Sequence, residues 1–370
     1  MLWYYGILAL LIFPMCYAYI GYKREVNIKN LILPLCIGIL AFFMSCRDVS
    51  VGADTCQYAY GFEQITTTPW SKLFATKIYG VGGGYELNFE YGYRLYNKLI
   101  SIISKNAQMI TIANSLLMMA LLGKLIKGHS PYVFLSVWLY ITLGIYQTQM
   151  NMARNAIAIL ICYLGCKYIE EHNIIKFLIC ATIATLFHSS SVLFIPVYWL
   201  VTKTELTGKK IGKILLLSVC CGLAFSFVRP LFVRFLPFGF GRYFVGNTSK
   251  FESLVVGAFH LALVAVVIFF TEKRNRAKMF ECEAVGIWMF VLEILFFCIG
   301  YDVASATRMA ALFGPYLIIL IPRLIENGIE SKNMRLNVIV LVVILSGVQY
   351  IARLQINNIG STMPYKFFWA

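Results

Sequence analysis

Apolar runs long enough to cross a lipid bilayer recur along the whole length of this 370-residue chain, and they limit the folds open to it. Hydrophobic residues make up 60% of the sequence and charged residues only 13%. A water-soluble domain of this size could not cover so much apolar surface. We expect the first run, 1–18, to be a retained helix, because no basic segment precedes it. The sequence therefore predicts an all-α, polytopic membrane protein in which residues 1–370 form one integral membrane domain.

About twelve membrane-spanning helices are predicted from apolar runs of roughly 15–20 residues. These runs fall at about 2–20, 31–44, 107–122, 132–146, 152–168, 174–187, 189–201, 211–227, 253–270, 284–299, 309–324 and 336–351. One set of alternate short loops is rich in Lys and Arg, which is typical of the cytoplasmic face. Both termini and the two long loops, 46–106 and 228–252, are then expected to lie outside.

The first outer loop begins with a cluster of charge. Arg47, Asp48 and Asp54 follow directly after an apolar run. Charges beside a membrane are costly, so this cluster indicates a site for an anionic, lipid-linked substrate. Further along, the segment 91–104 has apolar residues at helical spacing and predicts an amphipathic helix in the membrane interface. The glycine run at 80–84 is expected to act as a hinge or lid.

Arg154 is the most unusual single residue, because it lies in the outer end of a predicted span. An arginine at the centre of a span costs about 2.5–3.5 kcal/mol on insertion scales, and less near the interface. Snorkelling towards lipid headgroups is one interpretation. The nearby amide side chains favour a water-filled cavity instead, and they belong to Gln147, Gln149, Asn151 and Asn155.

Arg308 stands at the outer start of a later span. It either pairs with Asp302 to stabilise a loop or acts as a second phosphate ligand, and both interpretations stay open. Glu293, inside the preceding span, either pairs with an arginine or lines the cavity.

The second outer loop, 228–252, carries four basic residues against one acid, Glu252. Long loops tolerate such charge without any functional reason. The planar guanidinium group also matches phosphate oxygens in bidentate fashion, so a phosphate-binding arginine cluster is the other interpretation. Arg242 is a candidate because it lies among aromatic residues and glycines that suit a membrane surface.

His188 occupies a tight outer turn between two predicted spans. A lone histidine is often structural, but the imidazole group ionises near neutral pH and therefore also suits a general base. Asp54 and Glu90, in the first outer loop, are carboxylates that could serve the same purpose. The histidines show no metal-ligand spacing, and no phosphate-cradling loop or nucleic-acid tract is apparent. We therefore expect no metal, no cofactor and no nucleic-acid partner.

The order of several short motifs resembles the EpsG/Wzy-type polysaccharide polymerases, which build O-antigen, capsule or exopolysaccharide. Arg47 with 51–54 and Tyr58 is similar to the family pattern Arg…Val-Gly-Thr-Asp…Tyr. The further matches are 90–93 with Glu-Pro-Gly-Tyr, 151–156 with Asn-x-x-Arg-Gln-x-Ala, 187–190 with Phe-His-x-Ser, and Arg308, Pro315 and Pro322 with a late arginine span. Three positions depart from the patterns: Ala53 replaces Thr, Gly92 lacks the preceding Pro, and Asn155 replaces Gln.

The resemblance implies a metal-independent glycosyltransferase of the bacterial inner (plasma) membrane, with a bundle similar to the lipid-dependent GT-C-like glycosyltransferases. Its donor and acceptor would be undecaprenyl-pyrophosphate-linked glycans, used on the periplasmic or extracellular side, with membrane lipids and a chain-length regulator as further partners. The implied pyrophosphate ligands are Arg154, Arg308 and either Arg47 or Arg242. The implied base or acceptor-orienting group is Asp54, Glu90 or His188.

Two other functions fit parts of the sequence. A membrane O-acyltransferase of surface glycans would also use a histidine, and His188 fits that role, but such an enzyme gives no reason for the outer-face arginines. A flippase for lipid-linked oligosaccharides would line its cavity with charge on both faces, whereas the unusual charges here lie on the outer face.

Overall fold

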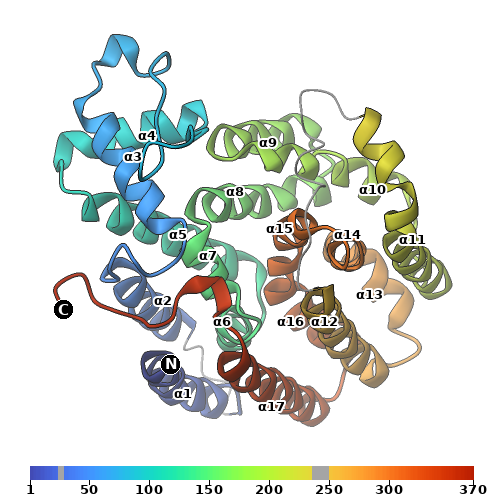
Figure 1. Cartoon of the computed structure of the whole chain (residues 1–370). Coiled ribbons are helices and arrows are strands. Elements are labelled where there is room, and N and C mark those ends of the chain that lie inside the picture. The colour runs from blue at the N-terminus through green and yellow to red at the C-terminus, as the bar shows by residue number, and fades with distance from the viewer. Residues whose placement is uncertain (24–28, 236–249) are drawn as a thin grey trace. The chain divides into compact units, whose positions relative to one another are not determined.

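The computed structural model describes residues 1–23, 29–235 and 250–370, and Figure 1 traces the chain. Helices dominate the described residues, where the β-structure consists of two isolated bridges, Arg47 to Phe367 and Tyr79 to Glu86. The predicted all-α class is confirmed. The predicted loop 228–252 lies largely outside the described residues, and Arg242 falls in that part.

Contacts group the chain into two units, Met1–Ile195 with Ser346–Ala370, and Pro196–Leu345. The first unit contains α1 (Leu2–Lys23), α2 (Lys29–Ser45), α3 (Thr55–Thr67), η1 (Trp70–Lys72), α4 (Tyr91–Ile103), α5 (Gln108–His129), α6 (Val133–Thr142), α7 (Ile145–Asn151), α8 (Ala153–Glu170), α9 (Ile174–Phe187), η2 (Ser189–Phe194) and η5 (Ile359–Ser361). The second contains α10 (Val197–Lys203), α11 (Gly208–Phe235), α12 (Lys250–Phe270), α13 (Arg276–Cys282), α14 (Ala284–Gly300), α15 (Ala304–Phe313), η4 (Gly314–Tyr316) and α16 (Leu317–Gly328). The helix α17 (Lys332–Ile356) contributes residues to both.

Within the first unit, α8 packs against both α5 and α9, and α2 packs against α1 and α5 (Figure 1). The helices α3 and α4 lie side by side and contact α5. Within the second unit, α14 is the central helix and contacts α11, α12, α15 and α16. The site described below belongs to the first unit.

Five described helices are long and apolar enough to cross a membrane, namely Gln108–His129, Gly208–Leu231, Glu252–Phe270, Ser305–Gly328 and Lys332–Ile356. The pair α13 and α14, which is bent by 80°, would make a sixth. These helices support the prediction of a membrane protein, but the count of about twelve spans is not confirmed. Several predicted spans are short or broken. The run 132–146, for example, forms α6 and α7, which are separated at Gly144 by a left-handed backbone (φ 76°).

The helix α4 has an amphipathic pattern, but its polar face is turned inward. Arg94, Asn97, Lys98 and Ser101 are buried. The exposed face is apolar and consists of Tyr91, Leu95, Leu99, Ile102 and Ile103. A helix at the surface of a water-soluble protein has the opposite arrangement. The exposed face of α4 therefore suits lipid better than water.

The buried cations of α4 hold the chain that precedes the helix. Lys98 Nζ donates hydrogen bonds to the carbonyl oxygens of Ile65, Thr66 and Thr68 at 3.1, 3.2 and 2.7 Å. These carbonyls lie at the C-terminal end of α3, where a helix lacks internal donors and favours positive charge. Arg94 Nε similarly donates to Phe89 O at 2.8 Å, directly before the helix begins. The polar face of α4 thus joins α3, α4 and their connection into one layer.

Residues 366–368 pack on residues 46–48, directly after α2. The backbone N–H of Asp48 donates to Lys366 O at 2.9 Å, and that of Phe368 donates to Cys46 O at 3.0 Å. At the other end of the chain, the hydroxyl of Tyr4 in α1 donates to Thr362 O at 3.0 Å. Both ends of the chain therefore support the segment that leads into α3.

Candidate functional site

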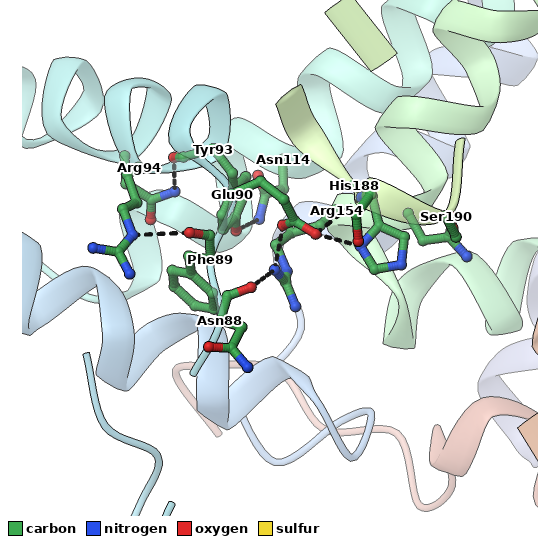
Figure 2. A network of polar contacts seen from close by, with 12 residues as sticks. Asn88, Phe89, Glu90, Tyr93, Arg94, Asn114, Arg154, His188 and Ser190 are labelled. Carbon is green, nitrogen blue, oxygen red and sulfur yellow. Dashed lines mark hydrogen bonds and ion pairs between the residues drawn. The ribbon is translucent and has the colours of Figure 1, made fainter. Parts of the chain in front are cut away.

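Glu90 lies at the centre of a polar cluster in the first unit (Figure 2). It is the N-cap residue of α4, and its side chain makes no capping hydrogen bond. Its Oε2 accepts a hydrogen bond from Arg154 Nη1 at 2.6 Å, while its Oε1 lies 3.1 Å from His188 Nδ1 and accepts the backbone N–H of Ser189 at 3.0 Å. One carboxylate thus joins the starts of α4 and α8 to the turn after α9.

Arg154, the second residue of α8, is held by backbone and aromatic rings as well as by Glu90. Its Nη1 also donates to Asn88 O at 2.9 Å. Its Cζ lies 4.7 Å from the ring centre of Phe89 and 5.7 Å from those of Tyr58 and Tyr93. Ring faces attract a cation, so this cage stabilises the guanidinium group. The side chain keeps 17% of its surface exposed, which leaves it partly accessible to a ligand.

The environment of Glu90 favours its charged form. Burial alone would raise its pKa, but the hydrogen bond from His188 and the charge of Arg154 outweigh burial, so the pKa of Glu90 lies below its ordinary value. Glu90 is therefore a carboxylate at neutral pH and accepts hydrogen bonds. Because Nδ1 of His188 faces this carboxylate, Nδ1 carries the proton of the neutral ring and Nε2 is the basic nitrogen. The pair has the arrangement of a general base with an orienting acid.

Asp54 lies close to this cluster. It is the N-cap residue of α3, its carboxylate makes no capping hydrogen bond, and the residue is half-buried. Its backbone N–H donates to Asn151 Oδ1 at 2.8 Å, which ties the start of α3 to the end of α7. Tyr58 lies one turn further along α3, and its ring centre is 5.7 Å from Cζ of Arg154. The structure thus brings together Glu90, Arg154 and His188 from three segments of the sequence, and Asp54 begins the helix whose Tyr58 lies beside Arg154.

Arg47 belongs to the interior of the same unit. Only 1% of the residue is exposed. It donates hydrogen bonds to Met44 O, to Ser115 Oγ at 3.2 Å and to Met150 O at 3.0 Å. These bonds hold the end of α2 against α5 and α7. A direct contact with pyrophosphate, as the resemblance implies, would require this arrangement to open.

Arg308 lies in α15 of the second unit and is exposed. The predicted alternative, an ion pair with Asp302, is not formed, because Asp302 pairs with Arg229 at 3.0 Å. No ion pair of Arg308 is found among the described residues. Glu293 does not pair with an arginine either. It is buried in α14, and its Oε1 lies 2.7 Å from His260 Nδ1.

The sequence analysis proposed the members of the cluster but missed its connections. The Glu90–His188 contact joins residues that are 98 positions apart, and no local pattern announces it. Phe89, whose ring lies nearest the guanidinium group of Arg154, was also missed. Its position directly before Glu90, in an otherwise glycine-rich connection, was the available signal. Among the described residues, no three His, Cys, Asp or Glu side chains gather so that they could hold a metal ion.

The fold and the site define a helical membrane protein with a histidine–carboxylate pair and an arginine at the ends of packed helices. A family model described as the EpsG family matches residues 30–367, nearly the whole chain. This chain belongs to the EpsG family, as the motifs indicated. The family supports a role as a polysaccharide polymerase with glycosyltransferase-like activity. Comparisons with curated proteins and with solved structures found no match.

Proposed function

We propose that this protein polymerises oligosaccharide repeat units carried on undecaprenyl pyrophosphate, on the outer face of the bacterial inner membrane. It transfers the glycan of one lipid carrier to the non-reducing end of another lipid-linked unit. The observation that carries the proposal is the carboxylate of Glu90, which holds a basic histidine and a cationic arginine in one partly exposed cluster. Family membership supports the same reaction class.

In the proposed reaction, His188 Nε2 removes the proton from the acceptor hydroxyl. The hydroxyl oxygen then bonds to the anomeric carbon of the donor sugar, and the bond from that carbon to the pyrophosphate oxygen breaks. The electron pair of that bond leaves with the pyrophosphate. Glu90 keeps Nδ1 of His188 protonated and stabilises the imidazolium ion that forms.

Arg154 supplies positive charge for the leaving pyrophosphate. Its Nη1 is engaged by Glu90 and by Asn88 O, and its Nε is buried, so phosphate oxygens would meet the N–H groups of Nη2. The ring of Phe89, whose centre lies 4.7 Å from Cζ, helps to hold the group in place before substrate arrives, and a preorganised donor costs little reorganisation during the reaction. Arg308 and Arg242 remain proposed phosphate ligands, and Asp54 a proposed acceptor-orienting group.

The direct test uses the purified protein in lipid nanodiscs with a synthetic undecaprenyl-pyrophosphate-linked repeat unit. A ladder of products on a gel, absent with His188→Ala, supports polymerisation. In a parallel reaction that also contains an acyl thioester as donor, acylated but unextended product would instead identify an acyltransferase. Movement of the labelled lipid across liposomes without extension would identify a flippase, and either result would overturn the proposal.

A further inference from the structure

The connection between α3 and α4 contains a short hairpin, residues 77–87. The backbone N–H of Gly80 donates to Tyr85 O at 2.9 Å, and that of Leu87 donates to Ile78 O at 2.7 Å. Gly82 and Gly83 form the turn with φ of 83° and 70°, a backbone region that favours glycine. The glycine run, predicted as a hinge or lid, therefore forms the tip of a hydrogen-bonded hairpin.

Two glutamines of α3 fasten this hairpin to the helix. The side-chain amide of Gln64 donates to Tyr79 O at 2.7 Å and accepts the N–H of Tyr79 at 3.0 Å, as a neighbouring strand would. Gln57 Oε1 accepts the N–H of Val81 at 2.9 Å. Since residues seven positions apart lie on one face of a helix, both contacts come from the same face of α3. The hairpin is thus held in a fixed place.

The ring of Tyr85 lies against the backbone of Gly80. A Cβ on Gly80 would be 2.5 Å from Cζ of that ring and 2.9 Å from Gln57 Oε1. Any side chain at residue 80 would therefore displace the ring. Tyr85 nevertheless keeps 51% of its surface exposed. The hairpin thus presents an aromatic ring that is supported on one side and open on the other, beside the amide of Gln57.

The start of α3 lies between the hairpin and the polar cluster around Glu90. Asp54 precedes Gln57 by three positions, which places both on one side of the helix start. Tyr58, four residues after Asp54, has its ring centre 5.7 Å from Cζ of Arg154. An aromatic ring, an amide and a carboxylate therefore follow one another from the hairpin towards Arg154.

We propose that Tyr85, Gln57 and Asp54 form a subsite for a sugar ring of the acceptor glycan. This inference rests on the proposed function. A sugar ring offers a C–H face that packs on an aromatic ring and hydroxyls at its edge that bond to amides and carboxylates. The subsite holds the acceptor next to the cluster where His188 removes its proton.

The composition of the hairpin favours a glycan over lipid. The exposed face of α4 is mostly Leu and Ile, whereas the hairpin exposes Tyr79 and Tyr85 together with the Lys77–Glu86 ion pair at 3.3 Å. Hydrocarbon does not accommodate an ion pair at low cost, while a hydrated glycan does.

The test uses the full-length protein in nanodiscs and a water-soluble oligosaccharide built from the same repeat units, with binding measured by calorimetry in the absence of donor. Tyr85→Ala is expected to weaken binding roughly 3- to 10-fold, the range for loss of one aromatic contact, while Tyr85→Phe keeps most of it. In extension assays the KM for acceptor should rise by a similar factor with kcat within about twofold. Tyr79→Ala is the matched control. The ring of Tyr85 lies over Gly80 on the opposite strand, and Tyr79 is the neighbour of Gly80, so Tyr79 points to the other face of the hairpin.

Wild-type binding in Tyr85→Ala, or equal losses in Tyr85→Ala and Tyr79→Ala, would overturn the subsite. So would a wild-type protein that extends lipid-linked units but does not bind the oligosaccharide, and the proposed function would then stand alone. If the wild type binds the oligosaccharide through Tyr85 but never extends it, the proposed function fails and the subsite stands. Thermal unfolding of each variant confirms that the fold is retained.

Discussion

Gly92 lies directly against Leu186, so that a Cβ at residue 92 would be 2.7 Å from both the Cβ and the backbone oxygen of Leu186. This close approach joins the first turn of α4 to the last turn of α9. It brings Glu90, two residues before Gly92, within reach of His188, two residues after Leu186. Backbone cannot move aside as a side chain can, so the contact fixes the spacing of the histidine–carboxylate pair.

Gly92→Ala should therefore separate Glu90 from His188. We expect polymerisation to fall by about 100-fold, because small misplacements of reacting groups carry costs of that order. The rate of ladder formation measures the effect. Gly128→Ala, in α5, is the control, since a Cβ there meets nothing within 4 Å. Equal activity in the two variants would contradict the importance of this contact.

His188→Ala should lower kcat by about 10²- to 10⁴-fold, the usual contribution of a general base. Glu90→Gln should lower kcat as well, because an amide does not stabilise the imidazolium ion. The control is His172→Asn, at an exposed histidine whose φ of 54° asparagine tolerates. A His188→Ala protein that extends glycan at the wild-type rate would exclude His188 as the base.

Glu90 should also make folding stability depend on pH. Its folded-state pKa lies below the ordinary value of 4.5, because the His188 hydrogen bond and the Arg154 charge outweigh burial. Its stabilising contribution is therefore complete above about pH 4.5 and is lost as pH falls through the lower, folded-state pKa. Thermal unfolding of the wild type and Glu90→Gln should differ by a constant amount at neutral pH, and the difference should shrink in acid. A difference that grows on acidification would contradict this assignment.

Arg154 and Arg47 should respond differently to substitution. Arg154→Lys keeps a charge for Glu90 but loses the planar guanidinium group that lies over the ring of Phe89, so we expect weak activity and nearly normal stability. Arg47→Met leaves the carbonyls of Met44 and Met150 without their donor, at a cost of roughly 1–3 kcal/mol each. Unfolding midpoints and extension rates, measured on both proteins, separate the two roles. A stable but inactive Arg47→Met protein would favour the pyrophosphate role for Arg47.

The exposed face of α4 should lie in the membrane interface. A spin label on Leu99→Cys, at a residue 49% exposed, is expected to be more accessible to oxygen than to a water-soluble nickel complex. The same label on Val81→Cys, in the hairpin, should show the reverse. Protection of the Leu99 label from both reagents would indicate a second protein chain in place of lipid.

Much of the site could be predicted from the sequence, because its residues are chemically out of place. Arg154 in an apolar run and His188 at a polar turn both stand out against a hydrophobic background. Their common partner could not be predicted, because it depends on the packing of α4 on α9 at Gly92. For Arg47 the sequence predicted a residue but not its surroundings. Its motif indicated a pyrophosphate ligand, whereas the structure shows a buried side chain that donates to backbone carbonyls.

Helix content was predictable from hydrophobicity, but the continuity of each helix was not. The run 132–146 is apolar throughout, and no property of its composition reveals the left-handed turn at Gly144. The amphipathic pattern of 91–104 indicated a helix, and α4 occupies Tyr91–Ile103. The same pattern could not show which face is turned inward, because that depends on the hydrogen bonds that Lys98 donates to carbonyl oxygens at the end of α3.

The C-terminal segment has a consequence for the order in which the chain is made. Residues 346–370 belong to the first unit, although the whole second unit is synthesised before them. The hydrogen bonds from Asp48 to Lys366 and from Tyr4 to Thr362 can form only after the second unit has been synthesised. The segment leading to Asp54 must therefore wait for these hydrogen bonds until the second unit has been synthesised, since ribosomes add only about 5–20 residues per second. A chain released before residues 362–368 are made would carry Asp54, Glu90, Arg154 and His188 without the hydrogen bonds that hold residues 46–48 in place.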